Sequence, residues 1–397
     1  MEALKVASYL RMSELDLHEK RLLIRVDFNV PMQDGKVTDV SRIKASLSTI
    51  QQAVDAGAGV LLMSHLGRPE EGRFDASLSL AAVAEVLSTM LDRPVPLVSD
   101  WLDGEIEPGQ VALAENVRFN LGEMANDEEL SKRMAALCDL FVMDAFGSAH
   151  RAQASTHGVA RFAPRACAGP LLDRELENIN RALQSPAPPV VAIVGGSKVS
   201  TKLETLRALI AKVDRLIVGG AMTNTFLAAG GYEVGASLYE PDMIDVATEL
   251  MRLARSRGVE LLLPDQVVCA SELSERAVAS AFSVSAVPAE QMIVDLGHEF
   301  TRRAAEELAE AGTIIWNGPV GVFEIDQFGE GTRILAEGVA ASPAFSIAGG
   351  GDTLAAIAKY GVADQISYIS TGGGAFLEMI EGKTLPAVEI LQQRSVN

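Results

Sequence analysis

The sequence has few cysteines, a shortage of basic residues and no long apolar run. Its three cysteines are an odd number without Cys-x-x-Cys spacing (Cys138, Cys167, Cys269), which favours a reducing compartment and buried thiols over disulfides or zinc. With 34 Lys and Arg against 53 Asp and Glu, the net charge is −19, which argues against binding to nucleic acid or to an acidic membrane surface. No apolar stretch reaches membrane-spanning length, and the acidic N-terminal segment lacks the apolar core of a signal peptide. We therefore expect a cytoplasmic protein that captures anions through local basic groups, and the lack of heptads favours a monomer.

The length and the pattern of apolar runs predict two domains. A chain of 397 residues with 48% hydrophobic content can form two cores. Strands alternating with helices predict an α/β protein with two Rossmann-like, doubly wound parallel sheets. One long amphipathic segment, Leu171–Gln184, is followed by the stiff sequence SPAPP and is expected to connect the two lobes. The expected parts are an N-terminal domain at 1–169, a connecting helix at 170–184 and a C-terminal domain at 185–383.

In the first half, hydrogen-bonding and cationic residues follow the predicted strands. Buried strands are expected at Leu22–Val26, Gly59–Met63 and Leu140–Met143, and another at VALA before ENVRF. Ligands of parallel α/β sheets lie beyond the carboxyl ends of the strands. Those ends carry Asp27, Asn29, His65, Arg68, Arg118 and Arg151. A lone Arg or His is usually a solvated or structural group, but the series predicts a pocket for a small molecule with several negative charges.

In the second half, five predicted strands end in glycine-rich turns instead. The turns are GGSKVSTK, GGAM, NGPVGVFE, GGGDT and TGGGAF. Glycines let the backbone approach a ligand closely, and free N–H groups attract phosphates. This edge is therefore expected to bind a nucleotide.

The stretch Phe345–Thr353 gives the strongest single signal of this kind. A short apolar run, three glycines and a helix-like segment follow one another, which is the order of an anion site. Asp352 would repel a bare phosphate, so it fits this place if Mg²⁺ lies between them or if it only caps the helix. Both interpretations remain open from the residues alone.

Lys198 and Lys202 follow the first of the glycine turns. They are four residues apart, which predicts one face of the helix after Gly196, within reach of phosphates. The alternative is a pair of solvated surface lysines. The segment lacks the G-x-x-x-x-G-K-[ST] spacing, and no His or Cys cluster has metal-ligand spacing.

Eight motifs in order resemble the phosphoglycerate kinase family from Leu22 to Ile390. They are RVDFNVP, SHLGRP, ENVRF, DAFGSAHRA, GGSKVSTK, WNGPVGVFE, AGGGDT and STGGGAFLE. The resemblance implies a two-lobed enzyme of glycolysis that transfers a phosphoryl group reversibly from 1,3-bisphosphoglycerate to Mg-ADP, giving 3-phosphoglycerate and ATP. It also implies that residues 384–397 return to the N-terminal, phosphoglycerate-binding domain.

By the same resemblance, each lobe has its own ligand residues. The substrate residues would be Asp27, Phe28, Asn29, Arg42, His65, Leu66, Gly67, Arg68, Arg118 and Arg151. The nucleotide residues would be Gly195, Lys198, Lys202, Gly219, Asn317, Glu324, Gly350, Gly351, Asp352, Thr353 and Gly373. Among these, Lys198 and Lys202 would meet phosphates, Glu324 the ribose and Asp352 the Mg²⁺. The phosphate chain would lie on Gly350, Gly351 and Thr353.

Two positions depart from the family pattern. Ala221 stands where a glycine is usual, and this departure is expected to trim the adenosine pocket slightly. His298, Glu299 and Phe300 stand where a turn with Pro and Thr is common, which puts the local loop geometry in question.

The implied chemistry needs no general base. The acceptor, a carboxylate or a nucleotide phosphate, is already anionic at neutral pH, so positioning and charge neutralisation must do the catalysis. We expect Arg42, Lys198 and an Asp352-bound Mg²⁺ to surround the transferred group, with Lys202 as the fourth catalytic residue. The lobes would close about the connecting helix and exclude water.

Two other functions remain open from the residues. A two-lobed anion-binding protein without catalysis would explain the arginines and the connector, but not Lys198, Lys202 and Asp352. A kinase of another small acid would differ only in substrate, and three arginines would be excessive for an acid without a phosphate.

Overall fold

The computed structural model describes residues 9–395 and divides into two compact units. Unit 1 comprises the described part of Met1–Glu177 and Thr384–Asn397, and unit 2 is Asn178–Lys383. The expected outer limits at residues 1 and 397 lie outside the described residues. The division falls inside the long helix α5, Pro170–Gln184, which has the bounds predicted for the connecting helix. Over 9–395, no helix has both the length and the apolar character needed to cross a membrane.

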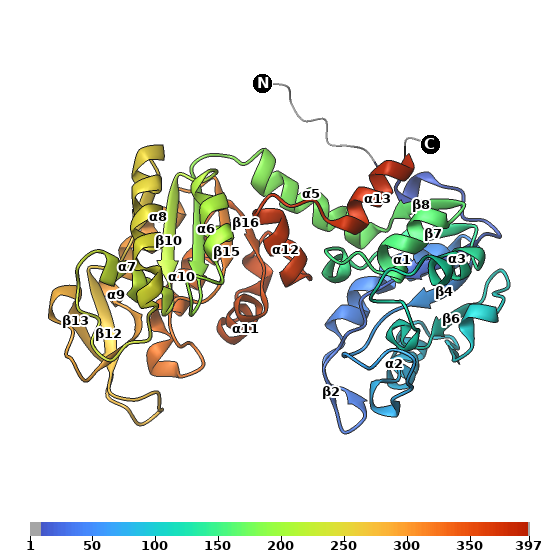
Figure 1. Cartoon of the computed structure of the whole chain (residues 1–397), viewed down its shortest axis with the longest axis horizontal. Coiled ribbons are helices and arrows are strands. Elements are labelled where there is room, and N and C mark those ends of the chain that lie inside the picture. The colour runs from blue at the N-terminus through green and yellow to red at the C-terminus, as the bar shows by residue number, and fades with distance from the viewer. Residues whose placement is uncertain (1–8, 396–397) are drawn as a thin grey trace. The chain divides into compact units, whose positions relative to one another are not determined.

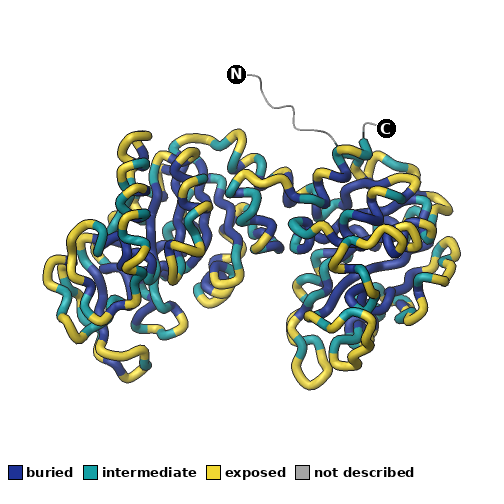
Figure 2. The backbone as a smooth tube through the Cα atoms, viewed as in Figure 1, coloured by how far each residue is buried: buried dark blue, intermediate teal, exposed yellow. Residues whose placement is uncertain are grey.

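Unit 1 is built on a six-stranded parallel sheet in the order β5-β6-β4-β1-β7-β8. The strands are β1 Arg21–Arg25, β4 Gly59–Met63, β5 Leu97–Val98, β6 Val111–Ala114, β7 Leu140–Met143 and β8 Arg165–Ala168. Apolar runs such as GVLLM form these strands because helices cover both faces of a parallel sheet. All five residues of β4 are accordingly buried, and in Figure 2 the dark blue buried trace runs through the interior of the unit.

Helices pack against this sheet through their apolar faces. They are α1 Ser41–Asp55, α2 Ala81–Met90, α3 Glu128–Ala136, α4 Val159–Phe162 and α13 Pro386–Ser395. Short helical turns are η1 Met12–Glu14, η2 Ala76–Leu78, η3 Trp101–Asp103, η4 Val117–Phe119, η5 Phe146–Ser148 and the π-helix η6 Ala154–Gly158. A small hairpin pairs β2 Met32–Gln33 with β3 Lys36–Val37. Figure 1 shows α13, in red, beside β8.

Unit 2 is built on a second six-stranded parallel sheet in the order β11-β10-β9-β15-β16-β17. The strands are β9 Val190–Gly195, β10 Arg215–Gly219, β11 Glu260–Leu262, β15 Thr313–Asn317, β16 Phe345–Ala348 and β17 Tyr368–Ile369. In chain order this is 3-2-1-4-5-6, the strand order of dinucleotide-binding folds, in which the direction of winding reverses between β9 and β15. The two doubly wound sheets predicted from the sequence are therefore confirmed.

The helices of unit 2 complete its core on both faces of this sheet. They are α6 Leu203–Ile210, α7 Met222–Ala229, α8 Ile244–Arg257, α9 His298–Ala309, α10 Glu330–Ala341, α11 Gly351–Tyr360 and α12 Gly373–Ile380. Short 3-10 helices are η7 Pro241–Met243, η8 Val284–Ala286, η9 Asp326–Phe328 and η10 Ala363–Gln365. Trp316 on β15 is 1% exposed and belongs to the apolar cluster of this unit.

A separate antiparallel sheet in unit 2 was not predicted. It has the order β13-β12-β14, with β12 Gln266–Ala270, β13 Ser280–Ser283 and β14 Met292–Leu296. Its outer strand β13 has no buried residue, so its sequence lacks the apolar run that marks the strands of the parallel sheets.

Candidate functional site

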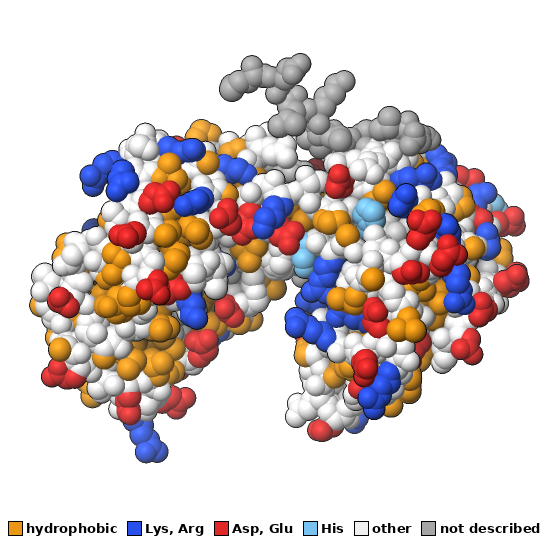
Figure 3. Space-filling view, viewed as in Figure 1, with side chains coloured by type: hydrophobic (Ala, Val, Ile, Leu, Met, Phe, Trp, Pro, Cys, Tyr) orange, Lys and Arg blue, Asp and Glu red, His pale blue; other side chains and the backbone are white. Residues whose placement is uncertain are grey.

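Unit 1 brings its candidate residues together at the carboxyl ends of four neighbouring strands. Asp27 and Asn29 follow β1, and His65 follows β4. Arg118 lies in η4 after β6, and Arg151 lies in the loop after β7. Since β6, β4, β1 and β7 are adjacent in the sheet, these side chains share one edge. Figure 3 shows acidic and basic side chains spread over the visible surface. The arginines at this sheet edge are therefore a local basic group in a protein whose net charge is negative.

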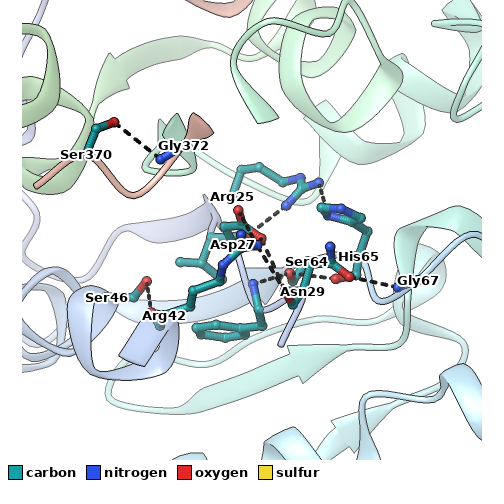
Figure 4. Close-up of polar contacts among 12 residues, drawn as sticks. Arg25, Asp27, Asn29, Arg42, Ser46, Ser64, His65, Gly67, Ser370 and Gly372 are labelled. Atoms are coloured by element: carbon teal, nitrogen blue, oxygen red, sulfur yellow. Dashed lines mark hydrogen bonds and ion pairs between the residues drawn. The ribbon is translucent and has the colours of Figure 1, made fainter. Parts of the chain in front are cut away.

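Arg42, near the start of α1, is held against the loop after β1. Its Nη1 donates to both carboxylate oxygens of Asp27 at 3.0 Å and to the carbonyl oxygen of Asn29 at 3.1 Å. The side-chain oxygen of Asn29 accepts a hydrogen bond from the Gly67 N–H at 2.9 Å, which joins the loops after β1 and β4 (Figure 4). These bonds use one nitrogen of the guanidinium group, so its other N–H groups can serve an anion.

His65 is nearly buried and lies against Arg25, a residue for which the sequence predicts only a place in a strand. The Nη2 of Arg25 lies 3.2 Å from the Nδ1 of His65 (Figure 4). Burial is the main cause that holds the pKa of His65 well below its usual value, and the charges of Arg25 and other arginines add to it. The imidazole is therefore neutral at neutral pH.

Arg25 is itself fully buried and belongs to a polar chain behind the site. Its Nε donates to the Ser155 hydroxyl at 3.0 Å and its Nη1 to the Val26 carbonyl oxygen at 2.5 Å. The hydroxyl of Ser155 donates to Glu123 at 2.5 Å, and the backbone N–H of Ser155 donates to the other carboxylate oxygen at 3.0 Å. None of these three residues was predicted, although an arginine inside the apolar strand LLIRV is a signal, because unpaired charges are rarely buried.

Arg118 lies next to the same group. It is 4% exposed, and its Nη1 donates to the carbonyl oxygen of Gly67 at 2.5 Å. Burial, then the charges of Arg151 and Arg25, lowers its pKa to about 10. Several guanidinium groups repel one another here and would be relieved by a bound anion. Arg68, by contrast, is exposed.

Two predicted substrate residues have their side chains in the core. Phe28 is 0% and Leu66 2% exposed, and both belong to the apolar cluster of unit 1. Their backbone groups fix the strand ends: the Phe28 N–H donates to the Ser64 hydroxyl at 2.8 Å, and Asn116 donates to the Leu66 carbonyl oxygen at 2.8 Å. A role for either residue in substrate binding would therefore pass through the backbone or the shape of the loop.

The loop after β7 is anchored at both ends. Asp144 caps the connecting helix, since its Oδ1 accepts from the N–H groups of Leu171 at 2.8 Å and Leu172 at 3.2 Å. Burial raises its pKa to about 7. Farther along, the Ala149 carbonyl oxygen accepts from the N–H of Ala387 at 3.1 Å, at the start of α13. The chain's last helix thus holds the loop that carries Arg151.

In unit 2 the glycine turns are crowded by the segment after β15. A Cβ on Gly195 would collide with the carbonyl oxygen of Pro319, and one on Gly219 would collide with Val320. These two glycines are therefore required by close backbone packing at the ends of β9 and β10. They lie beside the point where the winding of the sheet reverses, where ligands bind in such folds.

The prediction that Lys198 and Lys202 share a helical face is wrong. Helix α6 begins only at Leu203, and both lysines lie in the turn before it. In this turn, the N–H and the hydroxyl of Ser200 donate to the Glu240 carboxylate at 3.0 and 2.5 Å instead of supporting a helix. Lys198 is exposed.

Lys202 is partly buried at the end of β15. Its Nζ donates to the side-chain oxygen of Asn317 at 2.5 Å. Burial lowers its pKa, and the nearby charges of Asp352 and Glu381 oppose that shift. The structure thus brings Lys202, Asn317 and Asp352 together although they are far apart in the sequence.

Asp352 lies in the first turn of α11. The N-cap residue is Gly350, so Asp352 is not the cap of this helix, contrary to the simpler of the two interpretations. The N–H of Leu354 reaches the Gly350 carbonyl oxygen, which leaves the N–H groups of the preceding residues at the open helix end, where anions bind.

The hydroxyl of Thr353 is fully engaged inside this site. It accepts from the Gly318 N–H at 2.8 Å and donates to the Gly349 carbonyl oxygen at 2.9 Å. Asn317 donates to the same carbonyl oxygen at 2.7 Å. Thr353 therefore ties the turn after β15 to the turn after β16.

A cavity of about 340 Å³ opens beside these turns. Its walls are mainly apolar and include Ala221, Leu238 and Leu273. The acidic residues of the lining are Asp295, Glu324 and Asp352. Ala221, which stands where a glycine is usual, lines this cavity. The His298 segment forms a regular start of α9, so the second departure does not disturb the helix.

Two further predicted glycines lie close together in unit 2. A Cβ on Gly373, the first residue of α12, would lie 3.3 Å from the Cα of Gly350. The glycine turns after β16 and β17 therefore approach each other, and the starts of α11 and α12 lie at one edge of the sheet.

Comparison with known proteins gives one family. The family model of phosphoglycerate kinase matches residues 12–383. A curated phosphoglycerate kinase of Nitratidesulfovibrio vulgaris (strain DSM 19637 / Miyazaki F) is 59% identical over 387 residues, 97% of this chain and 98% of the relative. The structure of phosphoglycerate kinase from Coxiella burnetii matches with a TM-score of 0.95 at 56% identity, covering 98% of this chain and 100% of the other. The phosphoglycerate kinase of Pyrococcus horikoshii OT3 matches with a TM-score of 0.81 at 31% identity, covering 96% and 98%.

Proposed function

The chain belongs to the phosphoglycerate kinase family, and from that premise we propose how its own residues transfer a phosphoryl group between 1,3-bisphosphoglycerate and ADP. The enzyme is a phosphotransferase of glycolysis with a carboxyl group as acceptor, and the products of the forward reaction are 3-phosphoglycerate and ATP. The observation that carries the residue assignment is the contrast between two sheet edges. One edge carries arginines and the other carries glycine turns with two lysines and an aspartate.

We propose that unit 1 binds the phosphoglycerate. Arg68, Arg118 and Arg151, with His65, are suited to its phosphate, because guanidinium forks pair with phosphate oxygens. Arg42, fixed by Asp27 and the Asn29 carbonyl oxygen, is suited to the end of the molecule that reacts. Phe28, Asn29, Leu66 and Gly67 shape the loops around it.

We propose that unit 2 binds the nucleotide. The apolar cavity beside Ala221 takes the base, Glu324 the ribose, and the N–H groups at the start of α11 the phosphates. Lys198 and Lys202 neutralise phosphate charge from the turn before α6. The remaining predicted members of this site are Gly195, Gly219, Asn317, Gly350, Gly351, Thr353 and Gly373.

The residues of unit 2 fit a Mg²⁺ that arrives with the nucleotide. Within residues 9–395, no three His, Cys, Asp or Glu side chains gather into a metal site. Mg²⁺ commonly binds through one carboxylate together with substrate phosphates and water, and Asp352 in the first turn of α11 can supply that carboxylate. When bound, the ion would neutralise phosphate charge.

No residue has to remove a proton in this reaction. Both acceptors are anionic at neutral pH, so the side chains act by binding, orienting and neutralising charge. The neutral His65 fits this scheme as a hydrogen-bonding group. The acyl phosphate also has to be kept from water, which would hydrolyse it.

We further propose that the protein acts as a cytoplasmic monomer whose only ligands are these substrates, with no nucleic acid and no membrane. The acidic net charge of −19 supports the last two points. Light scattering of the purified protein tests the monomer, and a mass of two chains would contradict it.

The deciding experiment measures conversion of Mg-ATP to ADP that depends on 3-phosphoglycerate. Glyceraldehyde-3-phosphate dehydrogenase and NADH consume the acyl phosphate, so absorbance reports turnover. We expect turnover that needs every component and falls sharply in Asp352→Ala. The matched control is Asp364→Ala, an exposed aspartate beyond α11, which should behave as the wild type. Binding of both ligands without turnover would contradict the proposal.

A further inference from the structure

The contact between Arg25 and His65 fixes which nitrogen of the imidazole carries the proton. The Nη2 of Arg25 lies 3.2 Å from the Nδ1 of His65. A guanidinium group has five N–H donors and no acceptor. Nδ1 must therefore accept, so it carries no proton, and the proton of the neutral ring is on Nε2.

Arg25 cannot easily turn away from this contact. It is 0% exposed, and its other nitrogens are held by the Ser155 hydroxyl and the Val26 carbonyl oxygen. Ser155 is held in turn by both oxygens of the buried Glu123. Three side chains from separate parts of unit 1, those of Arg25, Ser155 and Glu123, thus fix one end of the imidazole ring.

The charged groups around His65 all oppose a second proton on the ring. They are Arg25 on β1, Arg42 on α1, Arg118 in η4 and Arg151 in the loop after β7. Together with burial they lower the pKa of His65 well below its ordinary value. Burial and these charges thus favour the neutral ring, in which Nδ1 accepts from Arg25.

We propose that Arg25 is a positioning residue that holds His65 as the Nε2–H tautomer, so that the ring always offers a hydrogen-bond donor to an anionic ligand. In the other tautomer Nε2 would be an acceptor and would repel a phosphate oxygen. This proposal depends on the proposed function only in naming phosphoglycerate as the ligand of His65. The tautomer itself is a property of the ligand-free protein.

The first test needs only the wild-type protein. Nitrogen-15 NMR of the imidazole rings distinguishes a protonated from an unprotonated Nδ1, and His65→Gln identifies the signal among five histidines. We expect the Nδ1 of His65 to stay unprotonated and its shift to stay constant from about pH 5.5 to 8.5. A protonated Nδ1, or a titration in this range, would overturn the proposal.

Variants test the role of Arg25. Arg25→Met removes the donor, and we expect both tautomers to appear. The KM for 3-phosphoglycerate should rise roughly fivefold, the value of one hydrogen bond, while kcat and the KM for the nucleotide stay unchanged. Arg25→Lys should restore the single tautomer and most of the affinity. Arg21→Gln is the matched control, since Arg21 lies at the other end of β1 and pairs with Asp139.

The outcomes separate this proposal from the proposed function. If Arg25→Met keeps the single Nε2–H tautomer with an unchanged KM, Arg25 has no positioning role. If Arg25→Met does not fold, the wild-type titration still decides the tautomer. A protein without turnover but with the expected nitrogen shifts would contradict the assigned activity and leave the tautomer standing.

Discussion

Replacing Thr353 by valine should destabilise unit 2 without removing any charge. Valine keeps nearly the shape of threonine but lacks the hydroxyl. Thr353 is only 1% exposed, and its hydroxyl bridges the Gly318 N–H and the Gly349 carbonyl oxygen. Gly349 keeps its bond from Asn317. The Gly318 N–H, however, would be left buried without its partner.

The expected loss follows from these two bonds. Each intramolecular hydrogen bond contributes about 1 kcal/mol, and an unsatisfied buried donor costs about 1–3 kcal/mol. The free energy of unfolding of unit 2 should therefore fall by about 2–4 kcal/mol. With an m-value of about 3 kcal/mol/M in urea, the unfolding midpoint should fall by about 1 M. Thr353→Ser keeps the hydroxyl and loses one methyl group, so its midpoint should fall by only about 0.3 M.

Fluorescence can follow unit 2 alone. The chain has two tryptophans, Trp101 in unit 1 and the buried Trp316 in unit 2, so a Trp101→Phe background leaves only the reporter beside the altered turn. Its indole N–H donates to the Gly318 carbonyl oxygen at 3.0 Å. If Thr353→Val and Thr353→Ser unfold at the same urea concentration, the hydroxyl does not hold these turns together, and the reasoning fails.

Three further outcomes follow from the site. Lys198→Ala should lower turnover by roughly 10²–10³, the usual cost of losing one preorganised charge donor. The control Lys212→Ala, beyond the far end of α6, should leave turnover nearly unchanged. Normal turnover of Lys198→Ala would contradict the role assigned to Lys198. Arg68→Ala should weaken the binding of 3-phosphoglycerate measured by calorimetry and leave the affinity for ADP unchanged. Arg73→Ala, on the same loop, is the control. An equal loss of both affinities would contradict the division of ligands between the units. Because burial raises the pKa of Asp144 to about 7, this carboxyl binds more protons in the folded protein than in the unfolded chain between about pH 4 and 7, so its contribution to the unfolding free energy should fall as pH rises through that range. Asp144→Asn should lack this part of the slope in urea titrations at several pH values, and an identical slope would show that Asp144 is ionised throughout.

The parallel sheets could be predicted because their strands are apolar runs. Gly59–Met63 and Leu140–Met143 have the predicted bounds, and β1 differs by one residue. In the antiparallel sheet, which was missed, β12 and β14 contain apolar runs but the half-exposed β13 does not. Local patterns identify strands that are buried on both faces, whereas pairing between short, half-exposed strands depends on contacts far apart in the sequence.

The candidate site was predictable where residues follow strand ends. Motif order located Arg118, Arg151 and Asp352, since the carboxyl ends of parallel strands share one edge. The sequence could not predict the turn before α6, because the bond from Ser200 to Glu240 comes from a residue 40 positions away. For the same reason, the sequence could not predict the series of polar contacts from Glu123 to His65, because its members lie on separate elements of unit 1.

The return of the last helix to unit 1 has a consequence for the newborn chain. Domains generally fold as units while the ribosome is still synthesising the rest. Unit 2, residues 178–383, can be complete before α13 has been made, whereas unit 1 must wait for Pro386–Ser395. The hydrogen bond from the N–H of Ala387 to the carbonyl oxygen of Ala149, in the loop that carries Arg151, can form only after α13 has been made. A chain interrupted before α13 would therefore contain all of unit 2 but only part of unit 1, and it would lack the hydrogen bond that holds the loop with Arg151.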